Sequence, residues 1–105
     1  MVKKADIRKL ARRIGREFHP ERVVLFGSFA EGRATADSDV DLLVVLPFHG
    51  TPLRKSVEIL NRLDVRFPLD LVARRPGDVR RRYAEGDPLI RDALDRGEVL
   101  YERNR

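Results

Sequence analysis

Two aspartates separated by one residue, Asp39 and Asp41, stand at the start of the longest apolar run in the sequence, residues 42–46. Alternate side chains of a β-strand point to the same face, so this spacing places both carboxylates together. Two carboxylates at the start of a buried strand repel each other and are costly to desolvate. A bound divalent cation removes both costs, and carboxylate oxygens with retained waters are the ligands that Mg²⁺ prefers. The pair therefore predicts a magnesium site.

A third acid, Asp70, lies between Leu69 and Leu71 in a second short apolar segment. If this segment is a strand beside the Asp39–Asp41 strand, its carboxylate completes a cluster of three acids. Two metal ions held there about 3.5–4 Å apart could clamp the attacking and leaving oxygens of an in-line phosphoryl displacement. Taken singly, an Asp-x-Asp pair is common in surface loops, and Asp70 could equally be a salt-bridged strand residue. The functional interpretation depends on the whole set.

Gly27 and Ser28 follow an apolar run and precede the acid pair by ten residues. A glycine directly after a strand lets the backbone approach a ligand closely. The Ser28 hydroxyl and the amides of the following turn could donate hydrogen bonds to a phosphate. We also expect Ser38, directly before the acid pair, to bind the nucleotide. A Gly-Ser pair alone is an ordinary turn.

The elements that position these residues follow from the apolar periodicity. A helix is predicted from about Asp6 to the His19-Pro20 pair, with strands over residues 23–26, 39–46, 69–72 and 99–101. The continuous apolar character of 39–46 predicts a central strand covered on both faces.

Two cap-then-proline signals, Thr51-Pro52 and Asp87-Pro88, each predict the start of a helix, and a weaker helix is expected over 76–85. Apolar residues of the first of these helices are expected to share one face: Leu53, Val57, Leu60 and Leu63. The order of elements predicts an α/β (α+β) domain, a small mixed β-sheet with helices packed on it, formed by residues 1–105 as a single domain.

Composition narrows the function classes. The chain has 105 residues, no cysteine and a net charge of +5. Thiolate metal sites and disulfides are excluded, and no run is long enough to span a membrane, so we expect a soluble cytoplasmic protein. The basic balance favours polyanionic partners such as nucleotides, RNA or an acidic protein, although an arginine-rich surface can also serve solubility alone.

The stretches LFGSFAEGRATADSDVDLLVV and PLDLV resemble the nucleotidyltransferase fold of the DNA polymerase β superfamily. Within it they resemble the minimal nucleotidyltransferases of bacteria and archaea, the antitoxin-type partners of HEPN proteins. The resemblance implies that Asp39 and Asp41 are metal ligands and that Asp70 is the third acid, which binds the catalytic metal and helps to deprotonate the acceptor hydroxyl. It also implies that Gly27 and Ser28 contact the triphosphate.

The resemblance further implies two Mg²⁺ ions, ATP as substrate, and transfer of AMP to a tyrosine of a helical HEPN toxin. The chain departs from the family at Glu31, where many relatives carry arginine. The alternatives are a non-catalytic binding antitoxin on the same fold, or a small-molecule nucleotidyltransferase working as a homo-oligomer. Nucleic-acid binding by the arginine clusters at 74–75 and 80–82 is less favoured, because no interleaved aromatic residues suggest base stacking.

Overall fold

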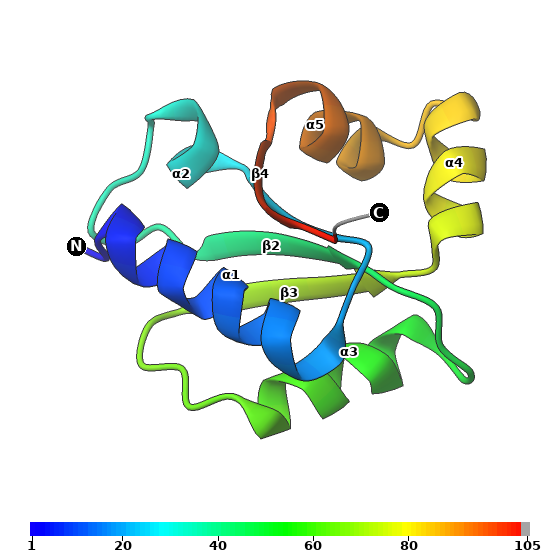
Figure 1. Ribbon diagram of the computed structural model, residues 1–105. Coiled ribbons are helices and arrows are strands. Elements are labelled where there is room, and N and C mark those ends of the chain that lie inside the picture. The colour runs from blue at the N-terminus through cyan, green and yellow to red at the C-terminus, as the bar shows by residue number, and fades with distance from the viewer. Residues whose placement is uncertain (104–105) are drawn as a thin grey trace.

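Four strands form one mixed sheet with the order β3-β2-β1-β4 (Figure 1). The computed structural model describes residues 1–103. β1 runs antiparallel to β2 and to β4, whereas β2 and β3 are parallel. The predicted mixed sheet is therefore confirmed. The strands are β1 (Arg22–Phe26), β2 (Val40–Val45), β3 (Leu69–Arg74) and β4 (Glu98–Glu102).

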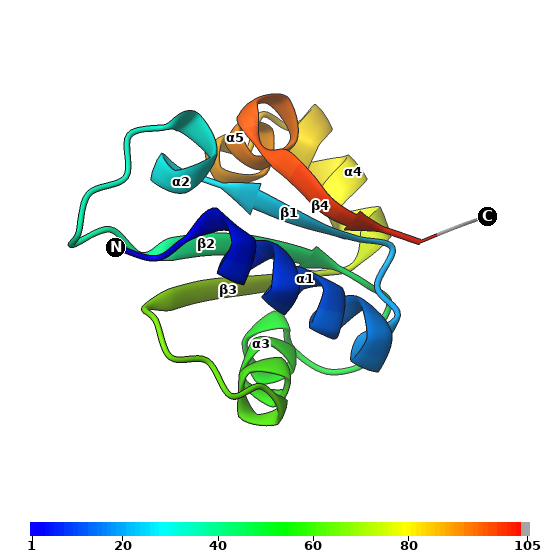
Figure 2. The same ribbon diagram turned by 60° about the vertical axis from the view of Figure 1, so that its left-hand side comes forward.

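Helices cover both faces of the sheet, as Figures 1 and 2 show. They are α1 (Lys4–Phe18), α2 (Ser28–Glu31), α3 (Pro52–Arg62), α4 (Pro76–Ala84) and α5 (Pro88–Arg96). Residues of α1 and α3 share one hydrophobic cluster with the strands, and residues of α4 and α5 share a second cluster on the opposite face. The sheet is the middle layer of the molecule.

β2 is the central strand on which the site depends. Its apolar residues from Leu42 to Val45 are at most 2% exposed, and alternate residues enter the two clusters. Burying one such side chain contributes about 1.5–3 kcal/mol relative to leaving it in water. The predicted coverage of this strand on both faces is confirmed.

The predicted buried face of α3 is wrong in part. Leu53 is 75% exposed and Val57 is 45% exposed, whereas Ser56 and Ile59 are buried. The Ser56 hydroxyl donates to the Pro52 carbonyl at 2.8 Å and accepts from the Ala73 amide at 3.0 Å. These hydrogen bonds offset the cost of burying a polar group. Leu60 and Leu63 pack in the α1–α3 cluster, so the predicted face is correct in its second half.

The two predicted caps that directly precede a proline are confirmed. The Thr51 side chain accepts from the Arg54 amide, and Asp87 accepts from the Ile90 amide. α1, by contrast, begins at Lys4 without a side-chain cap, so that Asp6 lies in its first turn instead of opening the helix. The sequence therefore predicts the start of a helix reliably where an aspartate or threonine directly precedes a proline.

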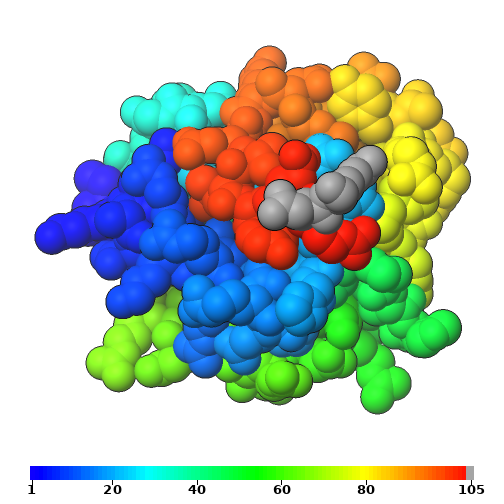
Figure 3. Space-filling model, viewed as in Figure 1, coloured from blue at the N-terminus to red at the C-terminus, as the bar shows by residue number. Residues whose placement is uncertain are grey.

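The first helix and the last strand pack together. α1 lies beside β4, and Figure 3 shows the two in contact on the surface. Lys4 Nζ is 2.6 Å from Glu98 Oε1, and the Tyr101 ring occupies the space beside Gly15. In residues 1–103, no helix has the length and apolar character needed to cross a membrane.

Candidate active site

Gly27, Asp41 and Asp70 lie together at one end of the sheet, where β1 ends and β2 and β3 begin. Asp41 is the register partner of Phe26 on β1 and of Asp70 on β3. Neighbouring strands lie roughly 4.8 Å apart, and register partners in a parallel pair point to the same face. The predicted adjacency of the Asp70 segment to the acid-pair strand is thus present in the structure.

Both acids lie on the face that α4 and α5 cover further along the strands. Leu43 and Val72, the next residues on this face of β2 and β3, pack in the α4–α5 cluster. Strand alternation then assigns Asp41 and Asp70 to the same side, beyond the edge of that cluster. Asp70 is exposed and Asp41 is half-buried, so the two carboxylates stand side by side at an open end of the sheet.

Gly27 lies directly against Asp41. Its φ of 74° and ψ of −154° fall in a region that is open essentially to glycine alone. A Cβ at this position would overlap Asp41 Oδ2 and lie 3.2 Å from Asp41 Cγ. The glycine after β1 is therefore required for the placement of the acid as well as for the backbone turn.

Asp41 has an unfavourable electrostatic environment for an ionised carboxylate. Burial, followed by the carboxylates of Asp70, Asp39 and Asp92, raises the pKa of Asp41. Three other carboxylates therefore disfavour the ionised form of Asp41. A cation bound between them would reverse the penalty.

Asp39 lies one residue before β2 and is exposed, so its position is set by the preceding loop and not by strand alternation. Among residues 1–103, no group of three or more acidic or histidine side chains is placed so that it could hold a metal ion, so the structure does not assemble the predicted cluster of three acids. Mg²⁺ is usually bound by one or two carboxylates together with substrate phosphates and water. An all-oxygen donor set at Asp41 and Asp70, with Asp39 nearby, fits a magnesium ion that arrives with a nucleotide.

The two predicted serines have different surroundings. Ser28 is the first residue of α2, directly after Gly27, and its carbonyl accepts from the Arg33 amide at 2.9 Å. Ser38 Oγ accepts from the Thr35 amide at 2.8 Å and lies 3.4 Å from Thr35 Oγ1. Ser38 thus stabilises the turn that carries the chain into Asp39, a contact that the sequence did not predict.

Glu31, the departure from the family pattern, has a cationic neighbour. Its Oε2 is 3.2 Å from Arg33 Nη2, and the Arg33 side chain is 64% exposed. A positive charge therefore stands beside the end of α2 although position 31 is acidic.

Asp92 is the acid that sequence reasoning missed. α5 packs on β1 and brings Asp92 close enough to raise the pKa of Asp41. It lies in a polar stretch of an amphipathic helix, where an aspartate is ordinary. Only the docking of α5 on the sheet reveals its proximity, so no local signal could have identified it.

Paired carboxylates thus lie at the end of a mixed sheet, with a glycine turn against them, and could supply oxygen ligands to a divalent cation. Residues 7–100 match the sequence model of the nucleotidyltransferase domain family, and the chain belongs to that family. No curated protein matches the chain.

Solved structures share the fold. A protein of Sulfolobus solfataricus assigned to the nucleotidyltransferases is 18% identical, with a TM-score of 0.63, over 92% of this chain and 78% of that chain. A toxin–antitoxin structure with AMP-PNP is 21% identical, with a TM-score of 0.59, over 98% of this chain and 76% of that chain. A mutant of the toxin–antitoxin pair MntA-HpeT is 18% identical, with a TM-score of 0.55, over 98% and 75%. At these identities the likeness establishes the fold.

Proposed function

We propose that residues 1–105 act as one catalytic domain that transfers AMP from magnesium-bound ATP to a hydroxyl, with pyrophosphate as the leaving group. The acceptor is a tyrosine of a helical HEPN-type partner, a toxin that the modification neutralises. The observation that carries the proposal is the pairing of Asp41 with Asp70 on adjacent parallel strands, with Gly27 packed against Asp41. Membership of the nucleotidyltransferase family and the structural likeness to toxin–antitoxin proteins support it.

Asp39, Asp41 and Asp70 would hold the magnesium ions, which when bound would neutralise negative charge on the triphosphate during transfer of the AMP group. Asp70 is exposed and lies on the outer side of Asp41, away from β1. An acceptor hydroxyl that reaches Asp70 would lose its proton to a carboxylate or to a water that this carboxylate orients. Gly27 and Ser28, on the β1 side, would bind the triphosphate. The two substrates therefore approach Asp41 from opposite sides.

Mass spectrometry of the co-expressed helical partner, incubated with magnesium and ATP, tests the proposal. We expect one added AMP with the wild type and none with the Asp39→Ala/Asp41→Ala variant. Asp37→Ala, in the same exposed loop, is the matched control and should retain the modification. Equal labelling by the double variant would contradict the assigned role of the acid pair.

A second candidate is a binding antitoxin on the same fold, which the acidic Glu31 at the end of α2 favours. Under this alternative the double variant forms the complex and rescues growth as well as the wild type, and no AMP is added to the partner. Growth rescue and labelling measured on the same variants separate catalysis from binding.

A further inference from the structure

The outward face of α1 carries a row of cations. Four basic side chains are exposed on the side of the helix that faces away from its buried apolar residues: Arg8, Lys9, Arg12 and Arg16. Figure 3 shows this helix, in blue, at the open surface of the molecule. The three arginines are four residues apart, so they follow one another at intervals of about 6 Å and the row is about 12 Å long.

No acid compensates this cation row. Among residues 1–103, none of its four side chains forms an ion pair or a hydrogen bond. The positions one helical turn before and after each of the three arginines hold only basic or uncharged residues. Like charges at this spacing destabilise a helix, so the row lowers the stability of the free protein.

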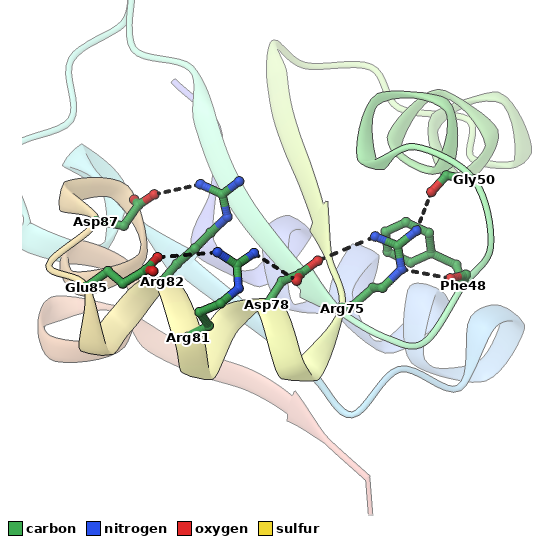
Figure 4. A network of polar contacts seen from close by, with 8 residues as sticks. All are labelled: Phe48, Gly50, Arg75, Asp78, Arg81, Arg82, Glu85 and Asp87. Carbon is green, nitrogen blue, oxygen red and sulfur yellow. Dashed lines mark hydrogen bonds and ion pairs between the residues drawn. The ribbon is translucent and has the colours of Figure 1, made fainter.

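The other long helices differ from α1 in this respect. On α4, Arg81 lies 3.1 Å from Asp78 and 3.3 Å from Glu85, as Figure 4 shows. Within residues 1–103, α3, α4 and α5 each carry a single exposed arginine without a partner, namely Arg54, Arg80 and Arg96. A continuous row of uncompensated cations is therefore a feature of α1.

A groove lies beside the cation row, between α1 and the segment that joins α3 to β3. Its volume is about 430 Å³. Leu10 of α1 and two residues of the segment, Val65 and Phe67, give it an apolar part. Lys9 and Arg16 line the same groove, so the cation row and the aromatic ring belong to one continuous surface.

This combination fits a single-stranded polynucleotide. Proteins bind single strands with cations that follow the backbone and with aromatic side chains on which bases stack. Phe67 is far from α1 in the sequence, and only the fold brings its ring beside the cations. An acidic protein fits less well, because none of the exposed large apolar side chains of residues 1–103 lies on α1, and protein interfaces depend on such anchors.

A carboxylate at the groove favours RNA over DNA. Asp6 lines the groove, is exposed and has no ion pair in the part of the chain that the structure describes. The other acid of the groove, Asp64, is held by Arg66 at 3.4 Å. A free carboxylate repels phosphate but accepts a hydrogen bond from a ribose 2′-hydroxyl, which DNA lacks.

We propose that the cation row and the adjacent groove bind single-stranded RNA. The phosphates contact the cation row, one base packs against Phe67, and a ribose hydroxyl donates to Asp6. This surface lies on the α1–α3 side of the sheet, whereas Asp41 and Asp70 lie on the α4–α5 side. Bound RNA therefore does not occupy the nucleotide site, and the inference goes beyond the proposed transfer reaction.

Fluorescence anisotropy with a labelled single-stranded RNA of about eight nucleotides tests the inference. Neutralisation of about four phosphates predicts a slope of about −3 for the logarithm of the association constant against that of the salt concentration. Arg12→Gln/Arg16→Gln should weaken binding about tenfold or more at low salt and reduce the slope by roughly 1.4. Arg54→Gln/Arg80→Gln removes the same charge from other helices and should leave both quantities close to the wild type.

An abasic strand of the same length tests the role of Phe67. The wild type should bind the RNA about tenfold more tightly than the abasic strand, as expected for one stacked base. Phe67→Leu keeps an apolar side chain in the groove and should remove this difference while the salt slope stays the same. Phe48→Leu, which removes a ring outside the groove, should retain the difference.

An absence of salt dependence, or equal losses in the two double arginine variants, would overturn the inference. Equal binding of DNA of the same sequence would overturn the assignment to RNA. Polyglutamate that displaces the RNA as well as unlabelled RNA does would assign the surface to an acidic protein instead. The binding experiments contain neither ATP nor magnesium, so a failure of AMP transfer would refute the proposed function and leave this inference standing.

Discussion

At the scale of single residues, the contact between Gly27 and Asp41 is the most constrained feature of the candidate site. The glycine has a positive φ, and its missing Cβ is the space that the Asp41 carboxylate occupies. The same carboxylate is surrounded by three other acids that raise its pKa. An ionised acid at this position lowers the stability of the fold in the absence of a cation. Such a cost is expected at a site where a bound cation compensates for the negative charge.

Gly27→Ala should disrupt the site through two separate effects. The backbone conformation costs about 1–3 kcal/mol for a residue with a Cβ, and the methyl group would displace Asp41. We expect a loss of transfer activity of about 10²-fold or more, measured by AMP incorporation. Gly32→Ala is the matched control, because Gly32 has the same φ of 74° but nothing within 4 Å of its Cβ position. Similar activity losses in the two variants would mean that strain alone is responsible.

Asp41→Asn should stabilise the ligand-free protein at neutral pH. Because the pKa of Asp41 in the folded protein is raised above its ordinary value of 3.8, the folded state holds the proton more tightly than the unfolded state. This contribution to stability is present below pH 3.8 and is lost as the pH rises through the folded pKa. Asparagine cannot ionise, so the variant does not lose this contribution to the free energy of unfolding as the pH rises.

Urea unfolding between pH 3 and pH 7 measures this difference. The two stability curves should converge at the acid end and separate as the pH rises, with the variant the more stable. Asp37→Asn controls for the loss of one negative charge in the same region. A variant less stable than the wild type at pH 7 would show that Asp41 has a compensating partner when ionised.

At the scale of elements, the outer edge of β3 is closed by side chains. The Ser56 hydroxyl accepts from the Ala73 amide, and Arg74 donates to the Ala73 carbonyl. Both polar groups of this residue are thus satisfied at an edge that would otherwise be open to pairing with another strand. α3 therefore has a polar residue at the centre of its buried face.

Ser56→Ala should destabilise the protein by about 1–3 kcal/mol, because it leaves the Ala73 amide buried without an acceptor. Alanine is the better helix former, so helix propensity alone predicts the opposite sign. Chemical denaturation gives the difference. Val57→Ala, on the exposed side of the same helix, should change the free energy of unfolding much less. A stability equal to that of the wild type would indicate that water replaces the hydroxyl.

The sequence predicted where helices and strands lie better than it predicted which face of each helix is buried. The cap-then-proline signals at Thr51 and Asp87 are local chemistry and located two helices, and the apolar run of β2 located the central strand. The exposed Leu53 shows the limit, because the orientation of α3 depends on the Ser56 contact with a distant strand. Likewise, the pairing that places Asp70 beside Asp41 could be proposed from the sequence, whereas the approach of Asp92 could not.

At the scale of the whole molecule, the net charge of +5 does not describe the local electrostatics of the surface. Many arginines are held by carboxylates on their own helix or by aromatic rings. Carboxylates collect at the end of the sheet where β2 and β3 begin, and there burial and the carboxylates of Asp70 and Asp39 raise the pKa of Asp41. A cation is therefore attracted to this end of the sheet although the net charge of the molecule is positive.

Ligand binding should therefore depend on magnesium and nucleotide together. Because the acids supply oxygen ligands but no complete cage, magnesium alone should change the melting temperature little, and a non-hydrolysable ATP analogue without magnesium should do the same. Together, at about a hundred times Kd, they should stabilise the fold by about 2.7 kcal/mol. For a domain of this size the melting temperature should rise by roughly 10 °C or more, as measured by differential scanning fluorimetry.

Asp39→Ala/Asp41→Ala should abolish this joint shift, and Asp37→Ala should retain it. An unchanged shift in the double variant would place the nucleotide elsewhere. The natural alternative is the cavity of about 430 Å³ between α4, α5 and the far end of the sheet, which Arg80 and Tyr83 line. Arg80→Gln would then reduce the shift, whereas under the proposed function it has no effect. The pair of variants thus assigns the nucleotide to one end of the sheet or the other.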